Sequence, residues 1–329
     1  MADESPYSLE PPKPEPLEEL AALYGAYAHA VCGRPLEDVD DLAERISAPG
    51  LDLSADARAC YADGDLVAWV QVGGSAPYTQ LDLWGAVHPE HAGRGIGTRL
   101  VQWALERADQ LSRRVPAGKR VVLRSELVGA DPRAVPLFEG LGFRVVRHYQ
   151  ELILRLVGPP ASPAFPVGIS VRTYRRGDDL RAICWANRQA FRDHWGYVER
   201  PFEDSLARFQ AMVQAPDFRP EDWFIAYDGD KVVGMALCRN SMPEDPHMAW
   251  VDSLCVRRHW RRRGIGLALL QHAIHAFYVR GKTSIALGVD TQSLTGATRL
   301  YEKAGMEPYQ VFHVVESVIR PGASSETTS

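Results

Sequence analysis

The sequence predicts a mixed α/β protein built from two copies of one domain. Three motifs occur twice in the same order, roughly 165 residues apart. Segments of strand periodicity alternate with segments of helical periodicity in the second copy. A proline-rich stretch, Gly158 to Gly168, separates the copies and predicts an extended connector. The repeated motifs are GDLVAWVQV and GDKVVGMAL, the G-I-G runs at Gly95 and Gly264, and LFEGLGF and LYEKAGM.

The expected domain boundaries follow from local composition. The first fifteen residues are acidic and proline-rich, and the last ten are small and polar, so neither segment can bury enough apolar area to order itself. The expected parts are a flexible arm (1–15), an N-terminal domain (16–157), a linker (158–168), a C-terminal domain (169–319) and a flexible tail (320–329). Each domain is long enough to fold around its own core without disulfides or metal.

The second copy carries the clearest periodicity. Period-two alternation predicts strands, and apolar residues three to four apart predict helices. The expected strands are Ile169 to Tyr174, Trp223 to Tyr227, Lys231 to Cys238, Met248 to Val256, Ser284 to Val289 and a last one after Gly305. The expected helices are Asp178 to Phe191, Phe202 to Val213, Gly264 to Tyr278 and Thr295 to Lys303. This alternation predicts a central sheet with helices packed on it.

The composition restricts the classes of partner. The formal charge of −5 provides no global basic field, so we expect binding neither to nucleic acid nor to an acidic membrane. No apolar run reaches the roughly 18 residues of a membrane span, and we expect no secretory signal. The five cysteines are scattered and odd in number, which indicates unpaired thiols in a reducing cytoplasm. We expect a cytoplasmic monomer or homodimer.

One basic loop carries the strongest chemical signal. The segment WVDSLCVRRHWRRRGIGLALL predicts a strand, an arginine-rich loop, and then Arg261-x-x-Gly264-x-Gly266 at the start of a helix. Amides at a helix start lack intrahelical partners, and glycines let an anion approach them, so the loop is predicted to hold a pyrophosphate. A glycine-tolerant turn beside a solvated charge run is the alternative. Two nucleotide motifs fail, because Leu269 replaces the third glycine of G-x-G-x-x-G and Ala276 the first glycine of a P-loop.

These residues resemble the GNAT superfamily of N-acetyltransferases, whose acetyl-CoA loop is a strand followed by Gln/Arg-x-x-Gly-x-Gly/Ala and a helix. The segment Leu300 to Met306 is similar to a second motif of that family, Leu-Tyr-Glu-Lys-x-Gly-Phe. The resemblance covers nearly all of residues 168–320 and, more weakly, 17–157, and the tandem arrangement is similar to that of the mycothiol synthases. It implies two tandem domains, each a mostly antiparallel sheet flanked by helices. It also implies acetyl-CoA-dependent N-acetyltransfer in the C-terminal domain, by direct attack of the acceptor amine on the thioester.

The resemblance implies a set of cofactor-binding residues. Strand amides near Leu254 and Val256 would hold the acetyl carbonyl as its oxygen gains charge. Ser293 replaces the Asn that related sequences often carry before the next helix. The implied contacts to acetyl-CoA are Leu254, Cys255, Val256, Arg261, Arg262, Arg263, Gly264, Ile265, Gly266, Ser293 and Tyr301, with Arg94, Gly95 and Gly97 as weaker counterparts in the first copy.

Two residues are candidates for proton transfer. Tyr301 falls on the position of the family's tyrosine, which protonates the departing thiolate; a packed aromatic is the alternative. An amine with a pKa near 10 must lose a proton before attack, and Asp252 is the candidate base. A salt-bridged or capping carboxylate is the alternative. Asp252 lies two residues beyond Trp250, which stands where several family members carry glutamate, and so on the same strand face.

The acceptor is expected to be a small molecule with a primary amine. The segment Phe191 to Tyr197 joins the two early helices, where the family usually shapes its acceptor pocket. We take His194, Trp195 and Tyr197, together with Trp250, as candidate contacts, although such a loop is equally consistent with packing on the sheet. A thiol-disaccharide amine of the mycothiol type, an aminoglycoside, an amino acid and a protein N-terminus all remain possible acceptors.

The first copy is expected to be degenerate. It carries Ala92, Leu83 and Phe138 at the positions of the loop arginine, the strand carboxylate and the motif tyrosine. We therefore expect no catalysis there and at most weak CoA binding. The alternative for the whole chain is a non-catalytic acyl-CoA-binding or regulatory module. His272 and His275 share one helix without a third ligand nearby in sequence, so we expect no metal site.

Overall fold

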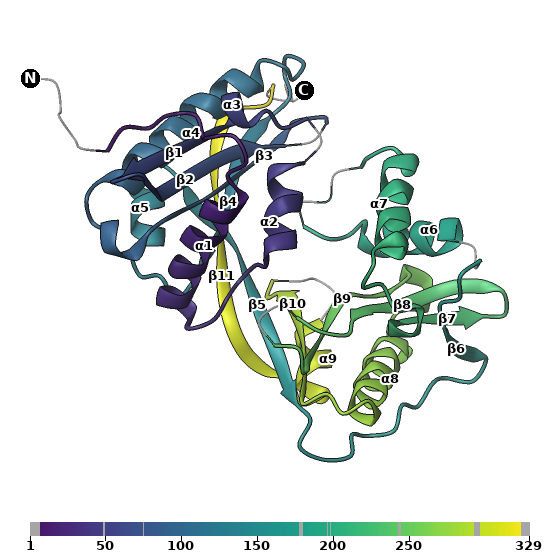
Figure 1. Cartoon of the computed structure of the whole chain (residues 1–329). Coiled ribbons are helices and arrows are strands. Elements are labelled where there is room, and N and C mark those ends of the chain that lie inside the picture. Colours follow the sequence, from purple (N-terminus) through teal and green to yellow (C-terminus); the bar gives the residue numbers. More distant parts are fainter. Residues whose placement is uncertain are drawn as a thin grey trace, which may run out of the picture. The chain divides into compact units, whose positions relative to one another are not determined.

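The computed structural model describes residues 7–48, 50–74, 76–177, 180–195, 197, 199–242, 245–292 and 297–323. The chain divides into two compact units, each with its own apolar core. Unit 1 contains Met1–His148 and Val311–Ser329, and unit 2 contains Tyr149–Gln310. Both units have a sheet flanked by helices, so the expected mixed α/β class is confirmed (Figure 1).

The sheet of unit 1 has the strand order β1-β2-β3-β4-β11. Strands β3 and β4 are parallel, and the other neighbours are antiparallel. Helix α4 packs on β2 and β3 and buries Leu100, Val101 and Ala104 in the core. The elements of this unit are α1 (Leu17–Cys32), α2 (Val39–Ile46), α3 (Leu53–Asp56), β1 (Ala57–Ala62), β2 (Asp65–Gly73), β3 (Gln80–Val87), η1 (Pro89–His91), α4 (Ile96–Ser112), β4 (Val121–Val128), α5 (Ala134–Gly140), the first part of β5 (Arg144–Arg155) and most of β11 (Glu307–Arg320).

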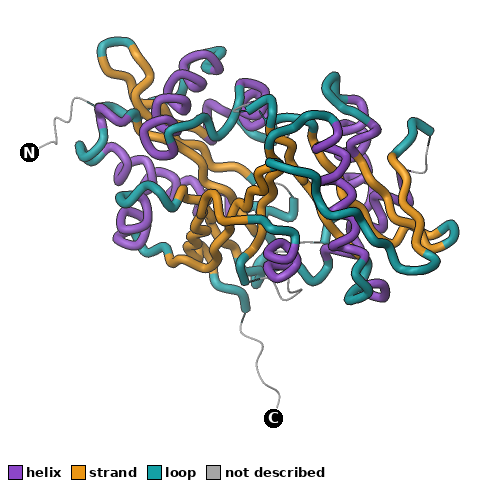
Figure 2. Tube along the Cα trace, turned by 90° about the horizontal axis from the view of Figure 1, so that it is seen from below, coloured by secondary structure: helices purple, strands orange, loops and turns teal. Residues whose placement is uncertain are grey.

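The sheet of unit 2 has the strand order β5-β10-β9-β8-β7-β6, with β9 and β10 parallel and the other neighbours antiparallel. Alternate residues of β7 enter two clusters: Phe224 packs with α8, and Ile225 packs with α6. These two helices therefore cover opposite faces of the sheet, as the labels α6 and α8 on either side of β7 and β8 show in Figure 1. Figure 2 shows the chain turned by 90°, with helices in purple and strands in orange. The elements are β6 (Ile169–Thr173), α6 (Leu180–Phe191), α7 (Phe202–Gln214), η2 (Pro220–Asp222), β7 (Trp223–Asp228), β8 (Lys231–Arg239), β9 (Met248–Val256), η3 (Arg258–Trp260), α8 (Ile265–Val279), β10 (Ser284–Asp290) and α9 (Ala297–Lys303).

The strands and helices expected in the second copy are present, and their described ends lie within two residues of the expected ones. Asp178 and Thr295, the expected first residues of two helices, lie outside the described residues. The agreement is close because each of these segments keeps one period along most of its length.

The expected domain boundaries differ from the structure at the last strand of each copy. Residues Phe312–Arg320 of β11 pair with β4, and Val315 is fully buried in the core of unit 1. Residues Tyr149–Arg155 of β5 pair with β10, and Leu152 is buried in the core of unit 2. Each copy therefore lends its last strand to the other copy's sheet. In Figure 1 the yellow β11 lies among the purple and blue strands of unit 1. Periodicity predicts such a strand but not the sheet it joins.

A buried ion cluster fixes β11 in unit 1. Glu316 is 9% exposed, and its two carboxylate oxygens accept from Arg120 at 2.6 Å and from Arg124 at 2.8 Å. Arg320, at the end of the strand, donates to the carbonyls of Ser112 and Lys119 at 3.0 and 3.1 Å. These contacts satisfy charges that would otherwise be costly to bury.

The terminal segments are more ordered than their composition predicts. Tyr7 is buried in the core of unit 1, and Glu10 exchanges two backbone hydrogen bonds with Ala59 of β1, at 3.0 and 2.8 Å. At the other end, the amide of Ala323 donates to the carbonyl of Gly118 at 2.8 Å. The expectation of a wholly flexible arm and tail is therefore wrong for residues 7–15 and 320–323. A short segment can order itself against an existing strand edge, which average composition does not reveal.

The repeat is visible in the packing at the start of α4 and of α8. A Cβ on Gly97 would meet the Leu137 side chain at 3.1 Å, and one on Gly266 would meet the Leu300 side chain at 3.1 Å. The glycines that precede the two helices, Gly95 and Gly264, both have left-handed φ, +77° and +85°. The second glycine of each motif thus lets the next helix approach closely, and the first one makes the turn.

Candidate functional site

The parallel strands β9 and β10 separate halfway along. They pair only over Met248–Val251 and Ser284–Leu287. Beyond that point β9 continues beside β8, and β10 continues beside β5. Within the described residues, Ser253–Val256 and Gly288–Asp290 therefore do not pair with each other, and the edges that face one another have no strand between them. Backbone groups on such edges can bind a ligand that lies extended between them.

Asp252 is an extra residue in β9, at the point where the strands separate. Leu237 of β8 lies opposite Ser253, and Cys238 lies opposite Val251, so the register of the pair shifts at Asp252. A bulge of this kind increases the twist of a strand and re-aims its side chains, and bulges are frequent next to active sites.

The loop before α8 contains two left-handed residues. Gly264 has φ +85° and Arg262 has φ +61°, which is strained by about 1–2 kcal/mol for a residue with a Cβ. Within the described part of the chain, the amides of Arg262–Leu267 have no hydrogen-bond acceptor, and the first helical bond runs from the amide of Ala268 to the carbonyl of Gly264 at 3.0 Å. These amides and the helix dipole give this end of α8 a partial positive charge.

The side chain of Arg261 is engaged within the protein. Its Nε donates to the carbonyl of Val256 at 3.0 Å, its Nη2 donates to the carbonyl of Ala190 at 2.7 Å, and its Nη1 lies 2.8 Å from Asp193. All three guanidinium nitrogens therefore have protein acceptors. The expected phosphate contact of Arg261 is not what this geometry favours; its observed role is to hold the loop.

The start of α8 nevertheless fits a diphosphate. Arg262 and Arg263 are exposed next to the unpartnered amides, and residues 257–267 contain no carboxylate. Gly264 has open space where its Cβ would be, so an anion could approach the backbone there. Gly266 serves the packing of α9 instead. The donor set is that of an anion site.

Tyr301, on α9, is buried in the core of unit 2, in the same apolar cluster as Ile265 of α8 and Val289 of β10. Burial raises the pKa of its hydroxyl to about 12. The structure gives the hydroxyl no hydrogen-bond partner among the described residues. At neutral pH it holds a proton that it can donate. Ser293, the expected contact before this helix, lies outside the described residues.

The remaining predicted strand residues point to opposite faces. Leu254 and Val256 pack with the α8 cluster, and Cys255 packs with the α6 cluster. Cys255, Cys184 and Cys238 are buried, and burial raises the pKa of each thiol, to about 12 for Cys255. Thiols in this state are poor nucleophiles. These cysteines are therefore unsuited to carry an acyl group.

Asp252 lies in a salt bridge, the alternative that the sequence left open. Its Oδ1 accepts from Arg239 Nε at 3.0 Å, and the two side chains are 24% and 42% exposed. Arg239 lies opposite Trp250 in the pairing of β8 with β9, and opposed residues share a face. The pair therefore stands on the same side of the sheet as Trp250.

The predicted acceptor contacts fall into two groups. Trp250 packs beside Met248 and the neighbouring Ala286 of β10. His194 and Trp195 follow the end of α6, where Nδ1 of His194 lies 3.1 Å from the carbonyl of Trp195. The amide of Tyr197 donates to the carbonyl of His194 at 3.2 Å. This loop thus folds partly on itself.

Two polar residues near the separated strands were missed from sequence. Asn187, on the sheet-facing side of α6, donates from Nδ2 to Ser253 Oγ at 2.9 Å. Asp193, in the loop after α6, accepts from Arg258 and Arg261. The sequence does contain a signal for Asn187, because it is a polar residue that lies between the buried positions Ile183 and Ala190 on the apolar side of an amphipathic helix.

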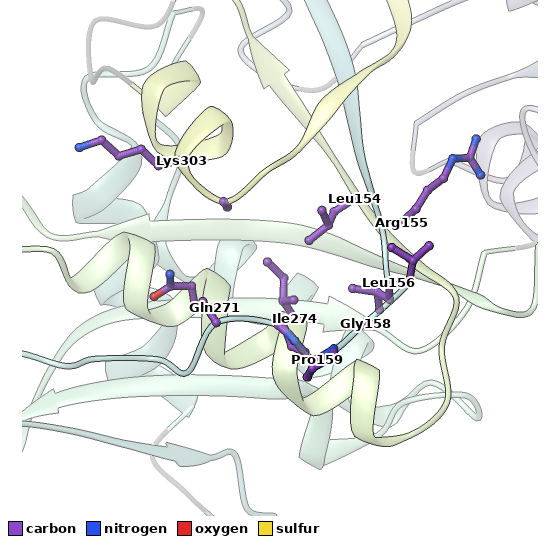
Figure 3. A pocket seen from close by; sticks show the side chains of 12 residues that line it. Leu154, Arg155, Leu156, Gly158, Pro159, Gln271, Ile274 and Lys303 are labelled. Atoms are coloured by element: carbon purple, nitrogen blue, oxygen red, sulfur yellow. The ribbon is translucent and has the colours of Figure 1, made fainter.

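A shallow groove elsewhere in unit 2 has a volume of about 310 Å³ (Figure 3). Its walls come from residues 154–161, from Gln271 and Ile274 in the middle of α8, and from the end of α9 at Lys303. None of the residues predicted for the cofactor or the acceptor lines it. The groove is therefore separate from the candidate site.

The first copy keeps the strand separation but not the site chemistry. Strands β3 and β4 pair only over Gln80–Asp82 and Val122–Arg124. The pairing of β2 with β3 is regular, without a bulge, and Leu83 lies opposite Val72. The interpretation that Leu83 takes the place of Asp252 is therefore wrong, because Asp252 is an insertion without a counterpart. Phe138 is buried where the second copy has Tyr301.

The loop of the first copy is covered by the N-terminal segment. Tyr7 OH accepts from Arg94 and lies 3.0 Å from His91 Nδ1, and the carbonyl of Tyr7 accepts from Arg99. Arg94 is the counterpart of the exposed Arg263. Gly95 still makes the left-handed turn, and Gly97 still allows the close approach of Leu137. Arg94, however, which would face a bound anion, already donates a hydrogen bond to Tyr7.

The described residues contain no group of three or more His, Cys, Asp and Glu side chains arranged to hold a metal ion. None of the described helices has the length and apolar character to cross a membrane.

Comparisons with known proteins point to one family. Residues 181–306 match the acetyltransferase (GNAT) family, and residues 56–145 match an acetyltransferase (GNAT) domain. The chain is 30% identical over 297 residues to a mycothiol acetyltransferase of Thermobispora bispora, covering 89% of this chain and 93% of that protein. It is 29% identical over 254 residues to a mycothiol acetyltransferase of Streptomyces bingchenggensis, covering 75% and 76% of the two chains.

Solved structures agree with this fold. A GCN5-related N-acetyltransferase from Sphaerobacter thermophilus has a TM-score of 0.79 and 33% identity, and covers 96% of both chains. A tandem GNAT protein from the clavulanic acid biosynthesis pathway has a TM-score of 0.72 at 17% identity, which bears on the fold alone.

Proposed function

The chain belongs to the GNAT family of N-acetyltransferases, and from that premise we propose that unit 2 transfers an acetyl group from acetyl-CoA to the primary amine of a small molecule. One observation supports this most. Within the described residues, only unit 2 combines the separated strands with a bulge at Asp252, an open helix start beside the exposed Arg262 and Arg263, and a protonated, buried tyrosine. Unit 1 keeps the strand separation and a glycine turn whose amides, Gly93–Thr98, also have no acceptor among the described residues. It has no bulge at this point, its Arg94 is engaged by Tyr7, and Phe138 takes the place of the tyrosine.

The proposed cofactor site runs from the start of α8 along β9. Acetyl-CoA, when bound, supplies the acetyl group as an activated thioester. The amides of Arg262–Leu267, with Arg262 and Arg263, would hold its diphosphate. The edge of Ser253–Val256 that faces away from β8 would hold the extended arm and the carbonyl.

The proton transfers are assigned to two side chains. The Tyr301 hydroxyl holds its proton at neutral pH and would donate it to the leaving thiolate. Asp252 would receive a proton from the acceptor amine, directly or through water, while Arg239 holds its carboxylate in place. The buried, protonated cysteines of unit 2 favour direct attack by the amine, without an acetylated thiol on the protein.

The acceptor proposed for the first test is a mycothiol-type thiol precursor with a free amine. Two relatives named mycothiol acetyltransferase align over most of their length with this chain. An aminoglycoside, an amino acid and a protein N-terminus are the competing acceptors. The five cysteines, all of them among the described residues, form no disulfide, which supports a reducing compartment such as the cytoplasm.

The decisive experiment is a panel of amines incubated with acetyl-CoA and the full chain, with CoA and the acetylated amine measured by chromatography, because a thiol-bearing acceptor would interfere with a free-thiol readout. We expect amine-dependent formation of CoA that saturates with one acceptor class. A Tyr301→Phe variant run in parallel separates enzyme turnover from spontaneous acetylation. Tight acetyl-CoA binding without turnover of any amine would contradict the proposal and favour a non-catalytic acyl-CoA-binding module.

A further inference from the structure

Asp193 joins the loop after α6 to the loop before α8. Its Oδ1 lies 2.9 Å from Nη2 of Arg258, and its Oδ2 lies 2.8 Å from Nη1 of Arg261. One carboxylate therefore holds two arginines of the same loop. Asp193 and Arg261 are 30% and 24% exposed, so their contact is less screened by water than an ordinary surface pair.

The contact completes a three-point attachment of Arg261. The other two points are the carbonyl of Val256 at the end of β9 and the carbonyl of Ala190 in α6. A planar guanidinium with acceptors on all three nitrogens is fixed in both position and orientation. The backbone of Arg261 is therefore held from the strand side and from the helix side at once.

The backbone conformation of Arg262 indicates the role of the three-point attachment of Arg261. Arg262 has φ +61°, a conformation that a residue with a Cβ adopts only when its surroundings hold it there. This turn leads directly into the amides of Arg262–Leu267, which have no acceptor among the described residues. Arg261 on one side and helix α8 on the other are the parts that hold the turn.

We propose that Asp193 is a positioning residue for the cofactor's diphosphate, acting through Arg261 on the amides at the start of α8. The inference rests on the proposed function, in which those amides bind the diphosphate. The first copy lacks the arrangement, since Pro89 and Ala92 stand at the positions of Arg258 and Arg261. The Arg261 contact also lowers the pKa of Asp193, so its carboxylate is charged at neutral pH.

The test compares two ligands on the full chain. Acetyl-CoA carries the diphosphate, and S-acetylpantetheine carries the same thioester without it; both affinities are measured by displacement of a fluorescent CoA. Asp193→Asn keeps the size of the side chain and removes its charge. We expect about 10- to 100-fold weaker binding of acetyl-CoA, the usual range for a lost charge-assisted hydrogen bond, and unchanged binding of S-acetylpantetheine.

Three further variants make the test specific. Arg261→Ala should have a similar effect, and Asp193→Asn should add little to it, because the two residues act as one unit. Asp193→Glu keeps the charge and should restore part of the affinity. Glu203→Gln removes a carboxylate from an exposed ion pair with Arg181 in the same unit and should change neither affinity.

The possible outcomes distinguish failure of the positioning role of Asp193 from failure of the proposed function. If the wild-type chain binds acetyl-CoA and Asp193→Asn binds it equally well, the positioning role is wrong and the proposed function stands. An equal loss for both ligands would also overturn it, because Asp193 would then act on the thioester or on folding; Asp193→Glu, with the melting temperature, tells which. If the wild-type chain binds neither ligand, the proposed function fails and the positioning role falls with it.

Discussion

Tyr301 and Phe138 occupy the same motif position in the two copies and differ by one hydroxyl group. Both rings are buried in the core of their own unit. The ring is thus common to the two packing arrangements, and the hydroxyl is what distinguishes the proposed catalytic copy. A substitution between phenylalanine and tyrosine isolates its role.

Replacing Tyr301 by phenylalanine is expected to lower kcat by about 10²- to 10⁴-fold, the typical contribution of a general acid. The KM for acetyl-CoA should change little, because the ring and its packing remain. Since the pKa of the hydroxyl is raised to about 12, the wild-type rate should show no alkaline decline from this group until the pH approaches 12. Steady-state kinetics over a pH series measures both effects.

The matched control is Phe138→Tyr, which should neither add activity nor replace Tyr301. A Tyr301→Phe variant with full kcat, under conditions where chemistry limits turnover, would make the tyrosine a packing residue. The identity of Phe138 would then say nothing about lost chemistry in the first copy.

At the residue scale, the candidate residues that belong to short sequence motifs could be predicted. Tyr301 and Gly264 follow from short repeated patterns, and both lie where the proposed site needs them. The partners of Arg261 could not be predicted, because Asp193 and Ala190 lie 68 and 71 residues away in the chain. Without those contacts, an arginine in this loop is most simply interpreted as a phosphate ligand.

At the scale of elements, the equivalent loops before α4 and α8 allow the same substitution to be compared in the two copies. Gly264 and Gly95 have the same left-handed conformation and open space at the position of a Cβ. The amides at both starts have no acceptor among the described residues, and Arg94 and Arg263 are both exposed. The loops differ in that Arg94 donates to Tyr7, which covers the first loop.

Gly264→Glu is expected to weaken acetyl-CoA binding by at least about 100-fold, because a carboxylate would occupy the place of the anion and a side chain is strained at φ +85°. Gly95→Glu carries the same strain and should leave the affinity unchanged. Calorimetry on the wild-type chain should give about one equivalent of acetyl-CoA. Two equal sites, or equal losses in the two variants, would show that the first copy binds the cofactor as well.

The bounds of strand β9 could be predicted from the sequence, but its bulge could not. Its bounds, Met248 and Val256, agree with the alternation in the sequence. The bulge at Asp252 does not appear in that alternation, because an inserted residue shifts the partner register and leaves the strand's own pattern nearly intact. The position of a bulge depends on the neighbouring strand, which lies outside the local sequence.

At the scale of the whole molecule, the exchanged last strands define which fragments can fold. Unit 2 is continuous in sequence, from Tyr149 to Gln310, and contains its complete sheet. Residues 1–148 lack β11, so the edge of β4 loses its partner strand, and Arg120 and Arg124 lose their ion pairs with Glu316. A boundary chosen from the proline-rich linker would cut both units.

We expect a fragment of residues 149–310 to be soluble and to melt cooperatively. A fragment of residues 1–148 should be unfolded or aggregated, because an unpaired strand edge and unpaired charges remain. Fusing residues 307–323 to it through a flexible linker should restore folding. Circular dichroism and thermal melting measure these outcomes; a stably folded 1–148 fragment would mean that β11 contributes little to unit 1.

The placement of β11 also determines the order in which the chain can mature on the ribosome. Translation proceeds at about 5–20 residues per second, so roughly 10–30 s pass between the synthesis of residue 148 and that of Arg320. During that interval unit 2 can complete its sheet, while unit 1 waits for its last strand. The half of the protein that is made first is therefore the half that finishes folding last, and β4 needs protection from other strands until the end of the chain arrives.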